Sequence, residues 1–149
     1  MSSKNFNTYI LVDKSPREAF QAINNVLGWW TENVKGNTQK LNDEFTVQFG
    51  DVHKSTQKLI EVIPDKKVVW LVTDSNLNFI KNKEEWTGTK ISFEISAKDN
   101  KTQVRFTHEG LVPEEECFDA CSNAWSEYIH ESLLYLITEG EGKPTLKEA

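Results

Sequence analysis

The longest periodic stretch of the chain is residues 114–139, EEECFDACSNAWSEYIHESLLYLITE. Large or apolar side chains recur in it at every fourth position, namely Cys117, Cys121, Trp125, Ile129 and Leu133. This spacing gives an α-helix one broad apolar stripe. The acidic run at 114–116 complements the positive end of the helix dipole, and Gly140 is a natural stop. We therefore predict one long helix from about 114 to 139.

Upstream of this helix the apolar period changes from 3.6 residues to two. Phe45, Val47 and Phe49 alternate with polar residues, and two later segments, 91–95 and 104–107, alternate in the same way. Alternation predicts half-buried strands, and the turn pairs Gly50-Asp51, Pro64-Asp65 and Asp99-Asn100 separate them into antiparallel hairpins. Residues 75–87, SNLNFIKNKEEWT, are polar and irregular, so we predict a long loop there.

The N-terminal part begins with a predicted strand at residues 6–12, FNTYILV. A helix follows, because Ser15 can cap it, Pro16 suits its first position and Glu18 completes a capping box. Asn24-Asn25 interrupts this helix before VLGWW, which predicts two short helices. Trp29 and Trp30 lie about 100° apart on a helix. We expect Trp30 to be the more buried and Trp29 to be partly exposed.

An antiparallel sheet with one apolar face needs that face covered. The helix at 114–139 is the one predicted element long enough to cover it, so we predict an α+β fold in which a curved sheet wraps around this helix. The length of 149 residues suits one domain over 1–149. We expect residues 6–139 to be ordered and the polar segment 140–149 to be a flexible tail.

Composition excludes several classes of function. The chain is 38% hydrophobic and 27% charged, and no apolar run has the length of a membrane span, so we expect no membrane partner. There are 17 Lys and Arg against 23 Asp and Glu, a net charge of −6, with the basic residues scattered. This argues against nucleic acid as a partner. The first 15 residues lack the features of a secretory signal, which predicts a cytoplasmic protein.

No cofactor or metal is indicated by motifs. Cys117 and Cys121 lie four apart in the predicted helix, where we expect reduced core residues; a metal pair is the alternative, but no nearby CxxC or HxxxH supplies further ligands. There is no Gly-x-Ser-x-Gly elbow and no Gly-rich phosphate loop, and His53, His108 and His130 fall in separate predicted elements.

Large rings dominate the positions expected to face the interior. The candidates for lining a cavity are Trp30, Phe45, Phe49, Trp70, Phe93, Phe106, His108, Trp125, Tyr128 and Ile129. Such a set can pack solidly or can enclose an apolar pocket, and periodicity does not separate the two. His108 shares the register of Val104 and Phe106, so it should face the helix, where it orients a ligand, shuttles a proton or is simply a hydrogen-bonded structural residue. We assign no catalytic residue, and His108 is the candidate.

Several short motifs, in this order and spacing, resemble a known family. They are SPREAF after the first strand, GWW, VKGN, IPDKKVVW, WTGTKISFEI, THEGLVPEEE and the helix pattern around Trp125, Tyr128 and Leu136. The chain is similar, from Phe6 to about Leu136, to the START-like (SRPBCC) helix-grip superfamily that includes the birch pollen allergen and polyketide cyclases. The nearest branch is named for the C-terminal domain of the activator of the heat-shock-protein-90 ATPase. The resemblance implies a sheet of about seven strands gripping the last helix, a cavity in many members, and no common reaction.

Three hypotheses of function follow. The first is the binding of a small hydrophobic or aromatic ligand between the sheet and the C-terminal helix, entered between the short helices, the 75–87 loop and the end of the long helix. The second is a chaperone-associated interaction protein, although the chain carries only the helix-grip domain, which argues against ATPase activation. The third is a cyclase- or hydrolase-like enzyme with His108 as its general base. The sequence does not identify the ligand.

Overall fold

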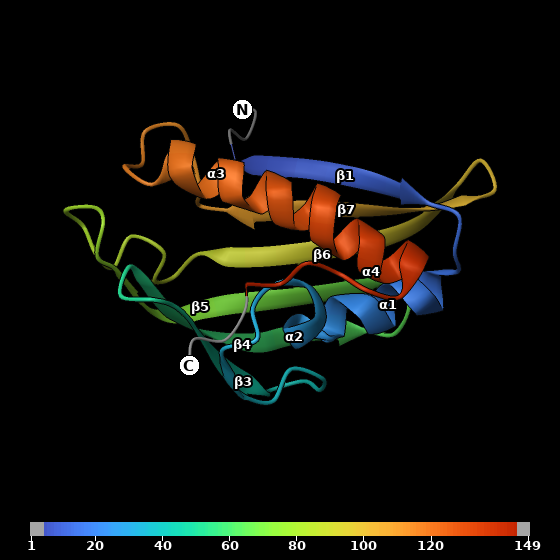
Figure 1. The fold of residues 1–149 in the computed structure, drawn as a ribbon, viewed down its shortest axis with the longest axis horizontal. Coiled ribbons are helices and arrows are strands. Elements are labelled where there is room, and N and C mark those ends of the chain that lie inside the picture. Colours follow the sequence, from blue (N-terminus) through green and yellow to red (C-terminus); the bar gives the residue numbers. More distant parts are fainter. Residues whose placement is uncertain (1–4, 146–149) are drawn as a thin grey trace.

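A seven-stranded antiparallel sheet wraps around a C-terminal helix (Figure 1), which confirms the predicted helix-grip fold. The computed structural model describes residues 5–145. The strands are β1 (Phe6–Val12), β2 (Val34–Gly36), β3 (Glu44–Phe49), β4 (His53–Ile63), β5 (Lys67–Leu77), β6 (Lys90–Lys98) and β7 (Lys101–Glu109). The helical segments are α1 (Pro16–Asn24), α2 (Val26–Trp29), α3 (Phe118–Glu127), the π-helical turn η1 (Tyr128–Leu133) and α4 (Leu134–Glu139).

The strand order is β1-β7-β6-β5-β4-β3-β2, so consecutive strands from β2 to β7 are neighbours. Because β1 and β2 lie at opposite edges, the chain between them has to cross the sheet, and α1 and α2 make that crossing (Figure 1). The long pair β4 and β5 contains register shifts between Thr56 and Gln57 and between Leu59 and Glu61. Such bulges bend a strand and increase its twist, which curves the sheet around the helix.

The predicted start of the first helix is confirmed. The backbone N–H of Glu18 donates to Ser15 Oγ at 3.1 Å, and Pro16 is the first helical residue. The helix buries Ala19 and Ile23 against the sheet. It ends at Asn24, because Asn25 leaves the helical region with ψ of 69°, and α2 then begins at Val26. The interruption at the asparagine pair is therefore also as predicted.

The long helix begins later than predicted and is not a regular α-helix throughout. Residues 114–116 lie in turns, and α3 starts at Phe118. In an α-helix of 3.6 residues per turn, side chains that recur at every fourth position point about 40° further around the helix axis at each recurrence. The wider π turn at Tyr128–Leu133 counteracts this drift, so Ile129 and Leu133 are buried like Trp125. The helix ends as expected at Gly140, whose φ is 84°.

The expectation that Trp29 is partly exposed is wrong, since Trp29 is 0% and Trp30 is 2% exposed. The short helix α2 is covered on two sides. Trp29 stacks on Trp70 of the sheet with ring centroids 6.4 Å apart, and its Nε1–H donates to the carbonyl of Ile23. Trp30 lies 4.9 Å from Trp125 of the C-terminal helix. Adjacent residues can thus both be buried when a helix is packed between two layers.

Two predicted irregular segments are partly ordered. β5 extends to Leu77, so the loop comprises residues 78–89 rather than 75–87, and it carries the buried Trp86. The segment predicted to be a flexible tail is described up to residue 145, where it makes specific contacts, and residues 146–149 lie outside the described residues. The backbone N–H of Lys143 donates to Ser132 Oγ at 2.7 Å, and Thr145 forms a bridge with Thr31.

Candidate functional site: an aromatic cavity under the C-terminal helix

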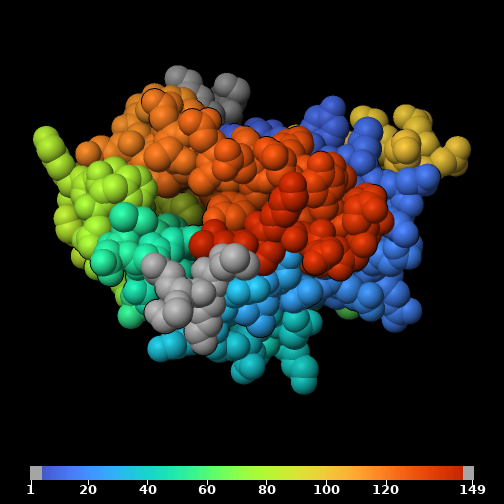
Figure 2. All heavy atoms as spheres, viewed as in Figure 1, coloured from blue at the N-terminus to red at the C-terminus, as the bar shows by residue number. Residues whose placement is uncertain are grey.

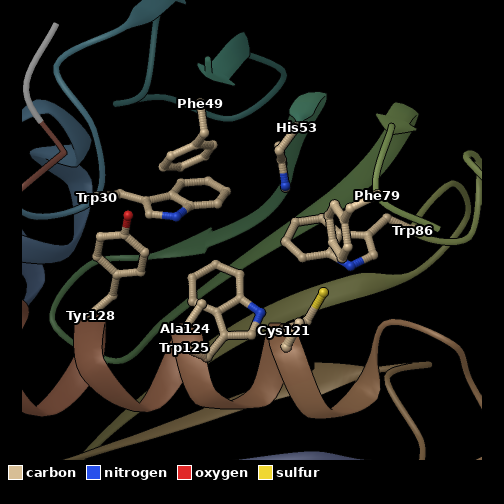
Figure 3. Close-up of a pocket in the computed structure, with 10 residues that line it drawn as sticks. Trp30, Phe49, His53, Phe79, Trp86, Cys121, Ala124, Trp125 and Tyr128 are labelled. Atoms are coloured by element: carbon tan, nitrogen blue, oxygen red, sulfur yellow. The ribbon is translucent and has the colours of Figure 1, made fainter. Parts of the chain in front are cut away.

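A cavity of about 210 Å³ lies between α3, the end of α2, the β3–β4 hairpin and the loop 78–89 (Figure 3). Figure 2 shows a hollow where the orange surface of α3 meets the green surface of the hairpin and the loop. The lining residues are Trp30, Phe49, His53, Phe79, Trp86, Ala120, Cys121, Ala124, Trp125 and Tyr128. The cavity opens between the short helix α2 and the loop 78–89, close to the predicted entrance. It adjoins the first half of the C-terminal helix, however, and not the end of that helix.

The structure divides the predicted cavity candidates into two groups. Trp30, Phe49, Trp125 and Tyr128 do line the cavity. The others are buried but lie in the filled core beside it, and they are Phe45, Trp70, Phe93, Phe106, His108 and Ile129. Trp29 fills the interior beside Trp70 and Phe93. Phe106 lies behind Trp125, with ring centroids 4.6 Å apart, and His108 lies behind Trp86 at 4.8 Å. The sheet and the helix therefore enclose a solid core at one end and a cavity at the other.

Six lining residues were absent from the predicted candidates, namely His53, Phe79, Trp86, Ala120, Cys121 and Ala124. A signal existed for His53, because it alternates with the inward residues Ser55 and Gln57 along β4. A weaker one existed for Trp86, since a tryptophan in a polar run usually needs a place in the core. Phe79 is exposed in a loop, and no local pattern marks it.

The walls form a continuous set of aromatic contacts. Trp86 stacks on Trp125 with an interplanar angle of 12° and centroids 5.8 Å apart. His53 lies edge-on to Trp86 at 4.7 Å and to Phe49 at 4.9 Å. Flat walls of this kind favour a flat apolar guest.

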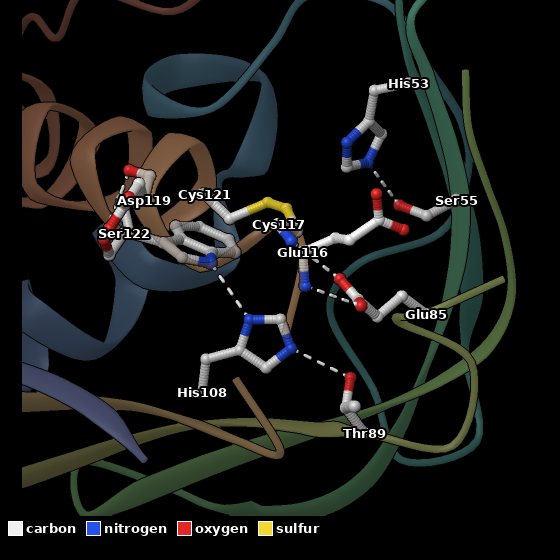
Figure 4. Close-up of a disulfide and its surroundings, with 11 residues drawn as sticks. His53, Ser55, Glu85, Thr89, His108, Glu116, Cys117, Asp119, Cys121 and Ser122 are labelled. Carbon is white, nitrogen blue, oxygen red and sulfur yellow. Dashed lines mark hydrogen bonds between the residues drawn. A yellow bond between two sulfur atoms is a disulfide. The ribbon is translucent and has the colours of Figure 1, made fainter. Parts of the chain in front are cut away.

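His108 faces the C-terminal helix as predicted, but both of its ring nitrogens are engaged (Figure 4). The indole N–H of Trp125 donates to His108 Nδ1 at 3.1 Å, so the neutral ring carries its proton on Nε2. Nε2 then donates to Thr89 Oγ1 at 2.8 Å, and the Thr89 hydroxyl donates to the carbonyl of Trp86 at 2.6 Å. Burial, with a smaller effect of His53, lowers the pKa of His108 to about 3. This arrangement describes a structural histidine that joins the helix, the sheet and the loop.

His53 is the polar side chain at the cavity wall. Its Nε2 lies 2.8 Å from Ser55 Oγ (Figure 4). Ser55 Oγ accepts a hydrogen bond of 2.6 Å from Gln57 Nε2. Burial lowers the pKa of His53 to about 3, so the imidazole is neutral near pH 7. A second polar group, the indole N–H of Trp86, is buried and has no hydrogen-bond partner among the described residues.

Reciprocal carboxylate contacts join the loop 78–89 to the segment before α3. Glu85 accepts hydrogen bonds from the backbone N–H groups of Glu116 and Cys117, at 2.9 and 2.8 Å. Glu116 in turn accepts from the N–H groups of Lys81 and Asn82. The N–H groups at the start of a helix have no partner within it, and Glu85 satisfies the two that directly precede α3. These contacts also hold Trp86 against the cavity.

The prediction of reduced cysteines is wrong for this structure, because Cys117 and Cys121 form a disulfide (Figure 4). Cys117 precedes α3 instead of lying within it, and the two Cα atoms are 5.5 Å apart, a separation that suits a disulfide. Within residues 5–145 no three or more His, Cys, Asp or Glu side chains are arranged to hold a metal ion.

A curved antiparallel sheet that holds a C-terminal helix over an aromatic cavity defines a protein of the helix-grip class. Within this class the chain belongs to the family described as "Activator of Hsp90 ATPase homolog 1-like protein", whose model matches residues 18–136. No protein of curated function matches the sequence.

Solved structures agree with this assignment. The solution structure of the Aha1 dimer from Colwellia psychrerythraea is 26% identical with a TM-score of 0.74, over 93% of this chain and 98% of that one. Protein SSP2350 from Staphylococcus saprophyticus is 13% identical with a TM-score of 0.69, over 95% and 98% of the chains. DynU16, a putative protein in the dynemicin biosynthetic locus, is 11% identical with a TM-score of 0.69, over 98% of this chain and 52% of that one. The last two show the fold alone. Among the described helices, none is long and apolar enough to span a membrane.

Proposed function

We propose that the protein binds a small apolar or aromatic molecule in the cavity beneath α3. The observation that carries this proposal is a hollow of about 210 Å³ with aromatic walls inside an otherwise densely filled interior. An apolar cavity of about 150 Å³ is enough to take up benzene. The volume therefore suits a guest of one aromatic ring with a short substituent.

Tryptophan fluorescence provides a direct test, because Trp30, Trp86 and Trp125 line the cavity. Ethylbenzene and indole would be titrated while fluorescence and backbone amide shifts are recorded. The expected result is saturable quenching, with amide shifts confined to the end of α2, the loop 78–89 and α3. A set of one-ring compounds that leaves all of these signals unchanged would refute the proposal.

A matched pair of variants on α3 sharpens the test. Ala124 lines the mouth of the cavity, whereas its neighbour Asn123 is exposed and does not line it. Ala124→Phe should fill the entrance and weaken binding by roughly tenfold or more, because the guest loses its buried apolar area. Asn123→Phe adds the same ring to the same helix and should leave binding unchanged. Equal effects of the two substitutions would contradict binding in this cavity.

A second candidate function is association with an Hsp90-class chaperone. It is favoured by the family to which the chain belongs and by its likeness to an Aha1 protein. A pull-down and an ATPase assay with the chaperone of the same organism test it, and absence of binding at high micromolar concentration would dismiss it. Ala124→Phe separates the two candidates, since it changes the cavity mouth on α3 and should spare an interaction made elsewhere on the surface.

A further inference from the structure

The cavity offers a hydrogen-bond donor and lacks charged side chains. None of the described residues that line it is an acid, a lysine or an arginine. The Tyr128 hydroxyl is engaged with Thr145 Oγ1, and the sulfur of Cys121 is bonded to Cys117. His53 remains as the lining side chain with a ring nitrogen that can serve a guest.

The hydrogen bonds along β4 are compatible with a proton on His53 Nδ1, the tautomer on which the proposal below depends. Gln57 Nε2 donates to Ser55 Oγ at 2.6 Å, so the Ser55 hydroxyl is free to direct its own proton to His53 Nε2 at 2.8 Å. A neutral imidazole that accepts at Nε2 carries its proton at Nδ1. Figure 4 draws this nitrogen on the side of the ring away from Ser55. The structure gives Nδ1 no partner among the described residues, so it is a donor available to a guest.

Trp86 contributes its ring to the wall rather than a donor to the cavity. Its side chain is 4% exposed, and its indole nitrogen is fully buried and has no acceptor among the described residues. His53 and Trp86 are in edge-to-face contact at 4.7 Å, so a guest that reaches His53 packs beside the Trp86 ring.

We propose that the ligand is a neutral, flat aromatic molecule with a hydrogen-bond-accepting oxygen, such as an aryl ketone or a quinone, and that His53 Nδ1–H donates to this oxygen. This inference rests on the proposed binding function and specifies the chemical class of its ligand. An organic cation would meet aromatic faces but no anion, and it brings no acceptor for the His53 N–H. A carboxylate would find no cation in the cavity and would lose hydration. Ser55 and Gln57 act as positioning residues, because they hold the imidazole in the required tautomer.

The experiment uses four probes of similar size: ethylbenzene, acetophenone, benzylamine and benzoate. Their dissociation constants are measured by amide shifts for the wild-type protein and for His53→Phe, which keeps a ring and removes the donor. In the wild type both charged probes should bind much more weakly than acetophenone. The ratio of the acetophenone constant to the ethylbenzene constant should rise about five- to tenfold in His53→Phe, as expected for one lost hydrogen bond.

A conservative variant distinguishes a donor from mere packing. In His53→Asn the side-chain amide nitrogen takes about the place of Nδ1, so this variant should recover the preference for acetophenone that His53→Phe loses. Nitrogen NMR of the wild-type imidazole reports the tautomer independently, and protonation at Nε2 would overturn the inference. An acetophenone-to-ethylbenzene ratio that is the same in all three proteins would also overturn it, while ethylbenzene binding would still support the proposed function. If none of the probes binds, the proposed function itself fails.

Discussion

At the scale of single residues, two inward histidines differ in what their nitrogens can still do. His108 accepts from Trp125 and donates to Thr89, so neither nitrogen remains for a substrate. His53 has one partner among the described residues and lies at the cavity wall. The sequence pointed to His108 because the register of β7 was clear. The hydrogen bonds of His108 are made with the helix and with the loop, and they occupy both of its nitrogens. His53 is therefore the better candidate for contact with a ligand.

The structural role of His108 leads to a prediction about stability. His108→Phe should lower the free energy of unfolding by roughly 1–3 kcal/mol, because the indole N–H of Trp125 loses its acceptor and Thr89 Oγ1 loses one of its two hydrogen bonds. Urea unfolding measures this, with Thr107→Ala on the opposite face of β7 as the control. Unchanged stability together with lost ligand binding would instead place His108 in the binding site.

At the scale of elements, the loop 78–89 and the segment before α3 behave as one unit. Glu85 and Glu116 each accept backbone hydrogen bonds from the other segment. The loop is polar and lacks regular structure, so these contacts, with the burial of Trp86, are what order it. The Cys117–Cys121 disulfide lies at the same junction. One side of the cavity mouth is therefore formed by the loop 78–89, whose position depends on the carboxylates of Glu85 and Glu116.

This junction should respond to pH. A hydrogen bond with Glu85, then partial burial and the charges of Glu85 and Glu114, raise the pKa of Glu115 to about 7. A raised carboxyl pKa means that the protonated form is favoured in the folded protein, so the contact is retained at low pH and is lost as pH rises through 7. Amide resonances of Glu116 and Cys117 should shift with a midpoint near pH 7. The shift should vanish in Glu115→Gln and persist in Glu84→Gln; a midpoint near the ordinary value of 4.5 would contradict the assignment.

At the scale of the whole molecule, the interior is divided along the long helix. One end is filled by Trp29, Trp70 and Phe93 in mutual contact, and the other encloses the cavity. The segment up to Thr145 returns along the helix and joins α2 to η1, because Ser132 Oγ donates to the carbonyl of Trp29 and accepts from the N–H of Lys143. The stability of the domain therefore depends on several buried polar groups as well as on its aromatic core.

Global stability should fall on mild acidification. His53 and His108 have pKa values of about 3 in the folded protein, against about 6.5 when unfolded. Between these values the unfolded chain binds more protons, so stability increases with pH up to about 6.5 and decreases as pH falls below it. The limiting slope is about 1.4 kcal/mol per pH unit for each histidine. Urea unfolding between pH 7.5 and 5.5 measures the slope.

His53→Asn serves as the control for this slope, since it removes one of the two buried titrating groups. The variant should lose about half of the histidine contribution between pH 6.5 and 5.5. Equal slopes in the variant and the wild type would show that His53 is not held neutral in the folded protein. The cause given for both depressed pKa values, desolvation by burial, would then be wrong for His53.

How far the sequence predicts this protein depends on the range of the forces involved. The cap at Ser15, the break at Asn24-Asn25 and the stop at Gly140 depend on neighbours within one helical turn, and all three are as predicted. The start of α3 was misplaced, and the N–H groups just before it are bound by Glu85 from a distant loop, a contact that no local pattern indicates. The exposure of Trp29 was misjudged for a similar reason, since it depends on the two layers that enclose α2.

The sequence by itself determined the order of the elements, the inward faces of the strands and of the helix, and the family. The order and the inward faces follow from periodicity and from caps, which depend on residues close in the sequence. The family follows from the resemblance of the short motifs and from the family model. Only the tertiary structure decided that Trp30 and Trp125 bound a cavity while Trp70 and Phe93 are packed in the core, and that His53 and Trp86 complete the walls. The physical reason is that a cavity remains where the side chains do not fill the volume that the backbone encloses. These side chains come from segments far apart in the sequence, so no local pattern predicts whether they fill it.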